Sequence, residues 1–148
     1  MQYSKTGEQL TEQFEGLRLT AYQDSVGKWT VGYGHTGQDV YPGLVITKAE
    51  AEMLLDIDIT GAERVINQHV TVALTQGEFD ALVDFVFNLG AFNFSRSTLL
   101  RDLNAGDYNG AAAQFERWSY AGAQKLAGLL RRRQAEEAEF NGPGTITS

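Results

Sequence analysis

The spacing of hydrophobic residues changes along the chain, and each change marks a different kind of element. Leu10, Phe14 and Leu17 stand at i, i+4 and i+7. This spacing predicts an amphipathic helix over about residues 5–15 that ends at Gly16. The next two segments, "LRLTAY" and "WTVGYG", alternate, and the turn-forming "DSVGK" lies between them. The alternation therefore predicts a β-hairpin.

From residue 47 onward the pattern is typical of helices only. The pairs Thr47 with Glu50 and Thr75 with Glu78 match the capping box that opens many helices. Further helices are predicted in "STLLRDLNAG", "YNGAAAQFERW" and "AQKLAGLLRRRQAEEAEF", the last of which ends at Gly142. The final "TITS" is expected to fray.

This order of elements predicts an α+β fold. At 148 residues, the chain has the length of one domain. We expect a small hairpin lobe over about residues 16–60 and a helical lobe over about residues 61–142 that also takes in the N-terminal helix. A cleft between the lobes is the expected place for an active site.

Composition limits the partners that the chain can bind. There is no cysteine and there are two histidines, which leaves no disulfide, no thiolate metal site and little to hold zinc. The net charge of −7 argues against nucleic acid, because phosphate contacts need a basic surface. The first residues lack the apolar core of a signal peptide, and no apolar run approaches the ~20 residues of a membrane span. We therefore expect a protein made in the cytoplasm.

The segment "GKWTVGYGHTG" contains the G-x-G-x-x-G pattern in Gly32, Gly34 and Gly37. Such glycines indicate phosphate binding only where a helix starts on them, and the next helix signal here is at Thr47. Strand alternation would instead place Thr30, Gly32 and Gly34 on one nearly bare face. A bare face of this kind is typical of a place where a ligand or another backbone comes close.

Two carboxyl groups lie near this face in the sequence. Glu15 ends the first helix, where the macrodipole favours the protonated form of a carboxyl group. Asp24 lies in the polar hairpin turn, which favours the ionised form. Two carboxyl groups in unlike environments suit glycoside hydrolysis, in which one protonates the leaving oxygen and the other acts at the anomeric carbon.

These residues closely resemble the catalytic signature of phage-type lysozymes, the endolysins of glycoside hydrolase family 24. Eight residues separate Glu15 from Asp24, and five separate Asp24 from Thr30. The resemblance continues through "FNLG", "STLLRDLNAGDY", "RW" and "GLLRRRQAE", so it covers nearly the whole chain. It implies a lysozyme-like fold and cleavage, without a cofactor, of the β-1,4 bond between N-acetylmuramic acid and N-acetylglucosamine in bacterial peptidoglycan.

The resemblance also implies roles for single residues. Glu15 would be the general acid, Asp24 would position or activate water, and Thr30 would help to hold that water. Gly32 and Gly34 are expected to line the substrate surface, where a side chain would fill the space of the sugar.

Further residues are expected to support the site. Asn88 matches a family stretch that lines the sugar cleft, and we expect it to contact substrate. Phe87 belongs to the same stretch but also fits the hydrophobic stripe of its helix, which favours a core position. His35 is expected to be a structural histidine paired with an acid from the helical lobe, because no nucleophile accompanies it.

Arg132 and Arg133 have two interpretations. They can form i, i+4 pairs with Glu136 and Glu137 on a solvated helix face. They also fall on the family's paired arginines, one of which would lie near the catalytic acid. The sequence leaves both interpretations open.

Two other functions are considered. A lytic transglycosylase needs a single acid and closes an anhydro ring, but Asp24 and Thr30 are suited to holding water. A wall-binding module without catalysis has no need of carboxylates at this spacing.

The chain departs from many family members in being acidic, which weakens electrostatic capture by an anionic wall. It resembles the members that wait in the host cytoplasm until a phage holin opens the membrane. Peptidoglycan is its expected partner, and we expect it to act as a monomer.

Overall fold

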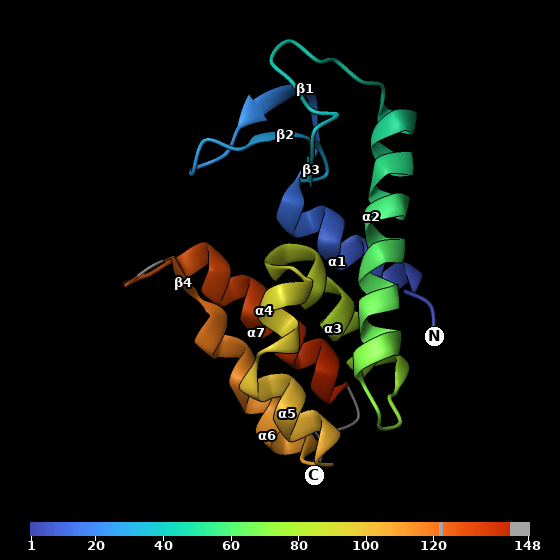
Figure 1. Cartoon of the computed structure of the whole chain (residues 1–148), viewed down its shortest axis with the longest axis vertical. Coiled ribbons are helices and arrows are strands. Elements are labelled where there is room, and N and C mark those ends of the chain that lie inside the picture. The colour runs from blue at the N-terminus through green and yellow to red at the C-terminus, as the bar shows by residue number, and fades with distance from the viewer. Residues whose placement is uncertain (122, 143–148) are drawn as a thin grey trace. The chain divides into compact units, whose positions relative to one another are not determined.

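The computed structural model describes residues 1–121 and 123–142 of the chain. Figure 1 shows the order of its helices and strands. They are α1 (Lys5–Glu15), β1 (Arg18–Gln23), β2 (Trp29–Gly32), β3 (His35–Thr36), α2 (Lys48–His69), α3 (Gln76–Leu89), α4 (Ala91–Ser95), α5 (Thr98–Asn104), α6 (Tyr108–Gln114), the 3₁₀ helix η1 (Phe115–Trp118), β4 (Tyr120–Ala121), β5 (Gln124–Lys125) and α7 (Ala127–Asn141).

The chain divides into two compact units. The small unit is Glu8–Gly61, and the helical unit joins Met1–Gly7 to the chain from Ala62 onward. Both boundaries fall inside helices, because α1 and α2 each begin in one unit and end in the other. The small antiparallel sheet and the many helices confirm the predicted α+β class. A cleft between lobes stays a prediction.

A three-stranded antiparallel sheet in the order β1-β2-β3 forms the centre of the small unit. The pairing of β1 with β2 confirms the predicted hairpin, with an irregularity between Arg18 and Tyr22. Thr30 of β2 lies opposite Thr36 of β3. Helix α1 ends as predicted, since Gly16 adopts φ +68° and its N–H donates to the carbonyl of Glu12 at 2.9 Å.

The segment before α2 covers the free edge of β1. The N–H of Ala21 donates to the carbonyl of Leu44, and the N–H of Ile46 donates to the carbonyl of Leu19, both at 2.8 Å. Ile46 is buried as a result, and it brings hydrophobic surface onto the sheet directly before α2 begins.

Both predicted capping boxes are present. Thr47 Oγ1 accepts the N–H of Glu50 at 3.1 Å, and Glu50 Oε1 accepts the N–H of Thr47 at 2.9 Å. Thr75 and Glu78 exchange the same pair of bonds at the start of α3. The side chains thus satisfy backbone N–H groups that have no partner inside the helix.

Helix α3 is the centre of the helical unit. All eight residues Phe79–Val86 are buried, as expected of a helix enclosed on all sides. The Phe85 ring meets the rings of Phe94, Phe115 and Trp118 edge-on, with centroids 5.6–6.1 Å apart. α7 packs against α3, so the face of α7 that meets it is also removed from water.

The prediction that only helices follow residue 47 is wrong. β4 and β5 form a two-stranded antiparallel sheet, in which Tyr120 pairs with Lys125. α7 therefore begins at Ala127, later than predicted. Each of these strands has only two residues, and an alternation this short cannot be distinguished from a helix by the period of its hydrophobic residues. The segment "TITS", which was expected to fray, lies outside the residues that the structure describes.

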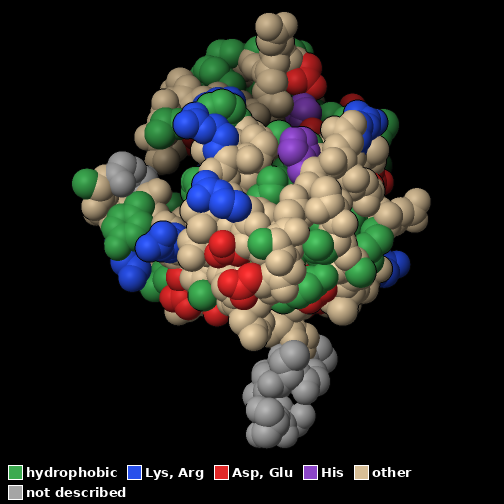
Figure 2. All heavy atoms as spheres, turned by 60° about the horizontal axis from the view of Figure 1, so that its bottom comes forward, with side chains coloured by type: hydrophobic (Ala, Val, Ile, Leu, Met, Phe, Trp, Pro, Cys, Tyr) green, Lys and Arg blue, Asp and Glu red, His purple; other side chains and the backbone are tan. Residues whose placement is uncertain are grey.

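Figure 2 shows how charged and hydrophobic side chains are distributed over one face of the molecule. The face drawn in Figure 2 carries acidic, basic and hydrophobic side chains interspersed with one another, so the net charge of −7 does not make this face uniformly acidic. Within the described residues, no helix combines the length and hydrophobicity needed to cross a membrane.

Candidate active site

Glu15 is the last residue of α1, and its side chain is half-buried. Its carboxyl group lies against the backbone of Gly34, so closely that a Cβ atom at Gly34 would overlap it. Gly34 also adopts φ +74°, a conformation that side chains other than glycine rarely take. Gly34 is therefore a glycine for two reasons, of which one is the room it leaves for Glu15.

Asp24 closes the loop between β1 and β2. Its Oδ1 accepts the backbone N–H of Val26 at 3.0 Å and that of Lys28 at 2.8 Å. The Asp24 N–H donates to the Lys28 carbonyl at 2.9 Å, which fixes the backbone of the same turn. Oδ2 makes no hydrogen bond to any described residue. One carboxylate oxygen thus builds the loop, and the other is left to accept a hydrogen bond.

Thr30 lies in β2 with only 4% of its surface exposed. Its hydroxyl donates to the carbonyl of Lys28 at 3.0 Å. A hydroxyl group has one proton to donate and two lone pairs, so Thr30 can approach a water molecule only as an acceptor. Lys28 links the two residues, since its N–H binds Asp24 and its carbonyl binds Thr30.

Gly32 does not lie on a bare face, and that prediction is wrong. Gly32 is buried, and a Cβ atom added to it would lie 3.3 Å from Ala51 Cβ and 3.5 Å from Ile46 Cδ1. Gly32 adopts φ +67°, so the alternation of the strand ends at this residue. A side chain at Gly32 would therefore meet α2 and the segment before it, and the lining of the substrate by Gly32 stays a prediction.

His35 is buried in the small unit between two carboxylates. Its Nδ1 lies 2.7 Å from Asp58 Oδ2 of α2, and its Nε2 lies 2.9 Å from Asp39 Oδ2. Burial by itself would lower the pKa of His35, but the hydrogen bonds and charges of Asp58 and Asp39 outweigh it and raise this pKa. His35 is paired as expected, but both acids belong to the small unit rather than to the helical lobe.

Arg132 and Arg133 are both buried in the helical unit. The Nε and Nη2 atoms of Arg132 donate to the two carboxylate oxygens of Asp84 at 2.9 and 2.8 Å. Arg133 Nη2 donates to Glu136 Oε2 at 2.9 Å. The interpretation as solvated i, i+4 pairs is wrong, because this face of α7 is turned toward α3.

Asn88 and Phe87 are half-buried at the end of α3. Asn88 Oδ1 accepts a hydrogen bond from Arg133 Nη2 at 2.9 Å. The fully buried aromatic residue of this turn is Phe85, so Phe87 lies at the margin of the core. The helical unit therefore holds Asn88 by its oxygen.

Comparisons with known proteins identify the family. The sequence profile described as phage lysozyme matches residues 12–136. The chain belongs to the phage lysozyme family. An endolysin of Acyrthosiphon pisum secondary endosymbiont phage 1 is 46% identical over 144 residues, covering 95% of this chain and 98% of the relative. A SAR-endolysin of Bacteriophage PS119 is 45% identical over 131 residues, covering 88% of this chain and 78% of the relative.

Solved structures agree with this lysozyme assignment. The muramidase domain of SpmX from Asticaccaulis excentricus is 38% identical, with a TM-score of 0.88. The match covers 96% of this chain and 99% of that domain. The endolysin of Escherichia coli O157:H7 phage FAHEc1 is 36% identical, with a TM-score of 0.85, over 95% of this chain and 93% of that one. The lysozyme-like fold is confirmed, and this phage lysozyme is a glycoside hydrolase; a binding module without catalysis is not favoured.

Sequence reasoning missed the buried Asp84 of this lysozyme and treated Glu136 as a solvated partner of Arg132, although Glu136 is buried. Asp84 is the partner of Arg132, and Glu136 is the partner of Arg133. Burial and a hydrogen bond with Asp84 raise the pKa of Glu136 well above its ordinary value, against the opposing charge of Arg133. A signal was present, because an acid within the apolar run of α3 must be paired when it is buried.

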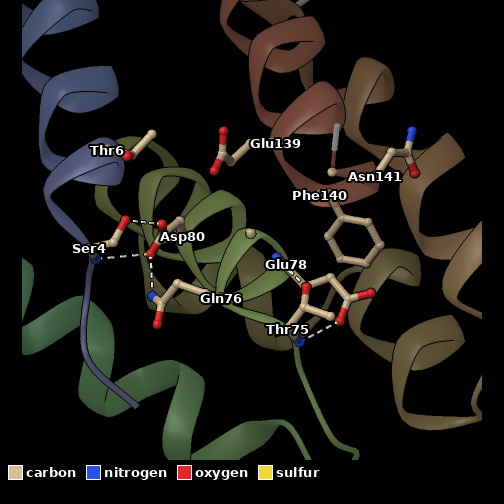
Figure 3. A pocket seen from close by; sticks show the side chains of 11 residues that line it. Ser4, Thr6, Thr75, Gln76, Glu78, Asp80, Glu139, Phe140 and Asn141 are labelled. Atoms are coloured by element: carbon tan, nitrogen blue, oxygen red, sulfur yellow. Dashed lines mark hydrogen bonds between the residues drawn. The ribbon is translucent and has the colours of Figure 1, made fainter. Parts of the chain in front are cut away.

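The helical unit of this lysozyme also contains a pocket of about 470 Å³ that holds none of the predicted site residues. Asp80 is fixed at its wall, since Ser4 donates to it through both backbone N–H and hydroxyl and Gln76 donates through its amide (Figure 3). Burial and the charge of Asp80 raise the pKa of Glu139, which also lines the pocket. Among residues 1–121 and 123–142, no three His, Asp or Glu side chains gather closely enough to hold a metal ion.

Proposed function

We propose that the enzyme hydrolyses the β-1,4 bond between N-acetylmuramic acid and N-acetylglucosamine in peptidoglycan and thereby lyses the host cell. The observation that carries this proposal is the Glu15 carboxyl group held against the backbone of Gly34 at the end of α1. A general acid must be held in one place, because proton transfer requires hydrogen-bond distance to the leaving oxygen.

Glu15 donates its proton to the glycosidic oxygen while the bond between that oxygen and the anomeric carbon breaks. Water adds to the anomeric carbon and gives its own proton to Asp24, whose Oδ2 has no partner among the described residues. Thr30 accepts a hydrogen bond from the same water, because its own proton is already given to the Lys28 carbonyl. The Asp24 loop and strand β2 thus orient the attacking water.

The product distinguishes hydrolysis from the lytic transglycosylase reaction. We expect a digest of purified peptidoglycan to yield muropeptides with a reducing N-acetylmuramic acid, one water heavier than the anhydro products of a transglycosylase. Mass spectrometry before and after borohydride reduction separates the two, because only the reducing end takes up hydrogen. Anhydro ends would show that water is not the acceptor, and an uncleaved glycan would contradict the proposal altogether.

We also propose that the enzyme stays in the host cytoplasm as a monomer until a holin opens the membrane. The similarity to a phage endolysin over nearly the whole chain supports this route. Expression in a bacterial host with and without a holin tests it. We expect rapid lysis only when the holin is present, and lysis at the same rate without a holin would contradict this route of release.

A further inference from the structure

Arg133 is fully buried and makes few hydrogen bonds. Its guanidinium carbon lies 5.3 Å from the centre of the Phe85 ring. Nη2 donates both to Glu136 Oε2 and to Asn88 Oδ1, each at 2.9 Å. Nη1 has no hydrogen-bond partner in the described chain, and Nε lies 2.7 Å from Glu136 Oε1 without the alignment of a hydrogen bond. Asn88 is therefore one of only two groups to which Arg133 makes a well-aligned hydrogen bond.

This contact fixes the orientation of the Asn88 amide. A guanidinium group has donors and no acceptor, so the amide oxygen of Asn88 must face Arg133 and the NH₂ group must point away from it. That NH₂ group makes no hydrogen bond to residues 1–121 or 123–142. Asn88 is half-buried, so it can offer a donor, and only a donor, to a ligand.

We propose that Arg133 is a positioning residue that makes Asn88 a donor specific for an amide carbonyl oxygen of the substrate. The proposal rests on the proposed glycan hydrolysis. Peptidoglycan offers this carbonyl in two places, the 2-acetamido groups of the sugars and the stem peptide. A group that offers only a donor in place of the carbonyl, such as the ammonium group of a de-N-acetylated sugar, leaves the Asn88 NH₂ group facing another donor.

Glu136 keeps Arg133 in this position. Its carboxyl group accepts a hydrogen bond from Nη2, the atom that also donates to Asn88, and it lies beside Nε, so it holds the guanidinium group next to the amide. Arg132, the neighbouring arginine, is paired with Asp84. The orientation of the Asn88 amide is thus set by the buried pair of Arg133 and Glu136. In the proposed role this pair does not contact the ligand itself.

The substitution Asn88→Asp tests the donor with little change of shape. A carboxylate accepts the bond from Arg133 but has no N–H to offer, so we expect the thermal midpoint to be kept and KM for intact peptidoglycan, which carries both carbonyl groups, to rise about tenfold. kcat is expected to change less, because the group binds rather than reacts. Asn109→Asp, which makes the same chemical change at an exposed position of α6, should match the parent.

Two substrates locate the carbonyl. If the acetamido group is bound, the parent prefers acetylated over de-N-acetylated strands and Asn88→Asp loses that preference. If the stem peptide is bound, the defect appears only with intact peptidoglycan. The inference is overturned if the parent cleaves these glycans and Asn88→Asp has the same KM as the parent on all of them. That result would leave the proposed function standing. A parent that cleaves none of them would refute the proposed function itself.

The role of Arg133 is tested by a double-mutant cycle. In an Arg133→Met background the amide is free to turn, so Asn88→Ala should cost much less in KM than the same change in the parent. Arg133→Lys, which keeps a donor, should restore part of the effect. The Asn88 side-chain amide signal in NMR should shift in Arg133→Met and not in Arg131→Met, since Arg131 is exposed. Additive effects would show that Arg133 is merely structural; if Arg133→Met does not fold, Asn88→Asp still decides whether the donor is used.

Discussion

Gly32 and Gly34 stand two residues apart, adopt similar backbone angles and have different neighbours. Gly32 packs against Ala51 and Ile46, whereas Gly34 lies against the Glu15 carboxyl group. The sequence predicted that both would face substrate, because strand alternation was extended past the point where the strand ends. The lack of a side chain is therefore needed for a different reason at each position, and only Gly34 contacts the proposed acid, Glu15.

Gly34→Ala is expected to reduce activity much more than stability. The substitution adds backbone strain of roughly 1–2 kcal/mol, and the new methyl group displaces the end of the Glu15 side chain. Gly43→Ala is the matched control, since Gly43 has φ +89° and no atom within 4 Å of an added Cβ. Thermal denaturation should show similar losses for both variants, and muropeptide release should fall only for Gly34→Ala. Equal activity of the two would show that the position of Glu15 is not critical.

Thr30→Val removes the hydroxyl group and keeps the shape of the side chain. We expect kcat to fall by more than KM changes, because the contact with water matters at the transition state. Loss of the bond to Lys28 should lower stability by about 0.5–1.5 kcal/mol. Thr60→Val removes a similar bond, from a hydroxyl to the Asp56 carbonyl at 2.8 Å, and should leave turnover intact. Unchanged turnover of Thr30→Val would exclude a role in holding water.

At the scale of elements, His35 connects β3 to α2 and to the loop that carries Asp39. The pKa of His35 is raised from its ordinary 6.5, and the hydrogen bond from His35 lowers the pKa of Asp39 below its ordinary 3.8. The stability that His35 contributes is therefore complete below about pH 6.5 and is lost as the pH rises through the raised value. The contribution of Asp39 is present above about pH 3.8 and is lost as the pH falls through the lowered value.

A pH series should show this window. The difference in unfolding free energy between the parent and His35→Gln is expected to be largest between about pH 4 and 6.5 and to decrease at higher pH. His69→Gln is the control, since His69 Nδ1 meets the Val65 carbonyl at 3.0 Å rather than a carboxylate. Urea denaturation at each pH measures both differences. A difference for His35→Gln that does not vary with pH would mean that the charged pair adds nothing.

The elements that the sequence predicted well are those with local signals. Gly16 ends α1, and Thr75 with Glu78 begins α3, because caps depend on neighbours within one turn. The burial of Arg132 and its pairing with Asp84, 48 residues away, depend on how α7 packs against α3. An i, i+4 pattern carries no information about that packing, so the arginines were also compatible with a solvated face.

At the scale of the whole molecule, the family resemblance carried what the local patterns could not. Alternation and spacing predicted a hairpin with Glu15 and Asp24 near it, but nothing in them required that these carboxyl groups act on a glycan. Residues 12–136 match the phage lysozyme profile, and the fold matches solved lysozymes over nearly its full length. The two compact units share α1 and α2, so a sequence boundary at residues 16 and 60 could not describe them fully.

The central claim is that Glu15 is the general acid, and one measurement tests it most directly: the rate of muropeptide release by Glu15→Gln. Glutamine preserves the volume of the side chain and removes the proton that the leaving oxygen receives, so the rate should fall by about 10²–10⁴-fold. The thermal midpoint should be held, and Glu12→Gln, one turn earlier in α1, should release muropeptides like the parent. Release by Glu15→Gln at the rate of the parent would contradict the account, because the acid would then have to be another residue.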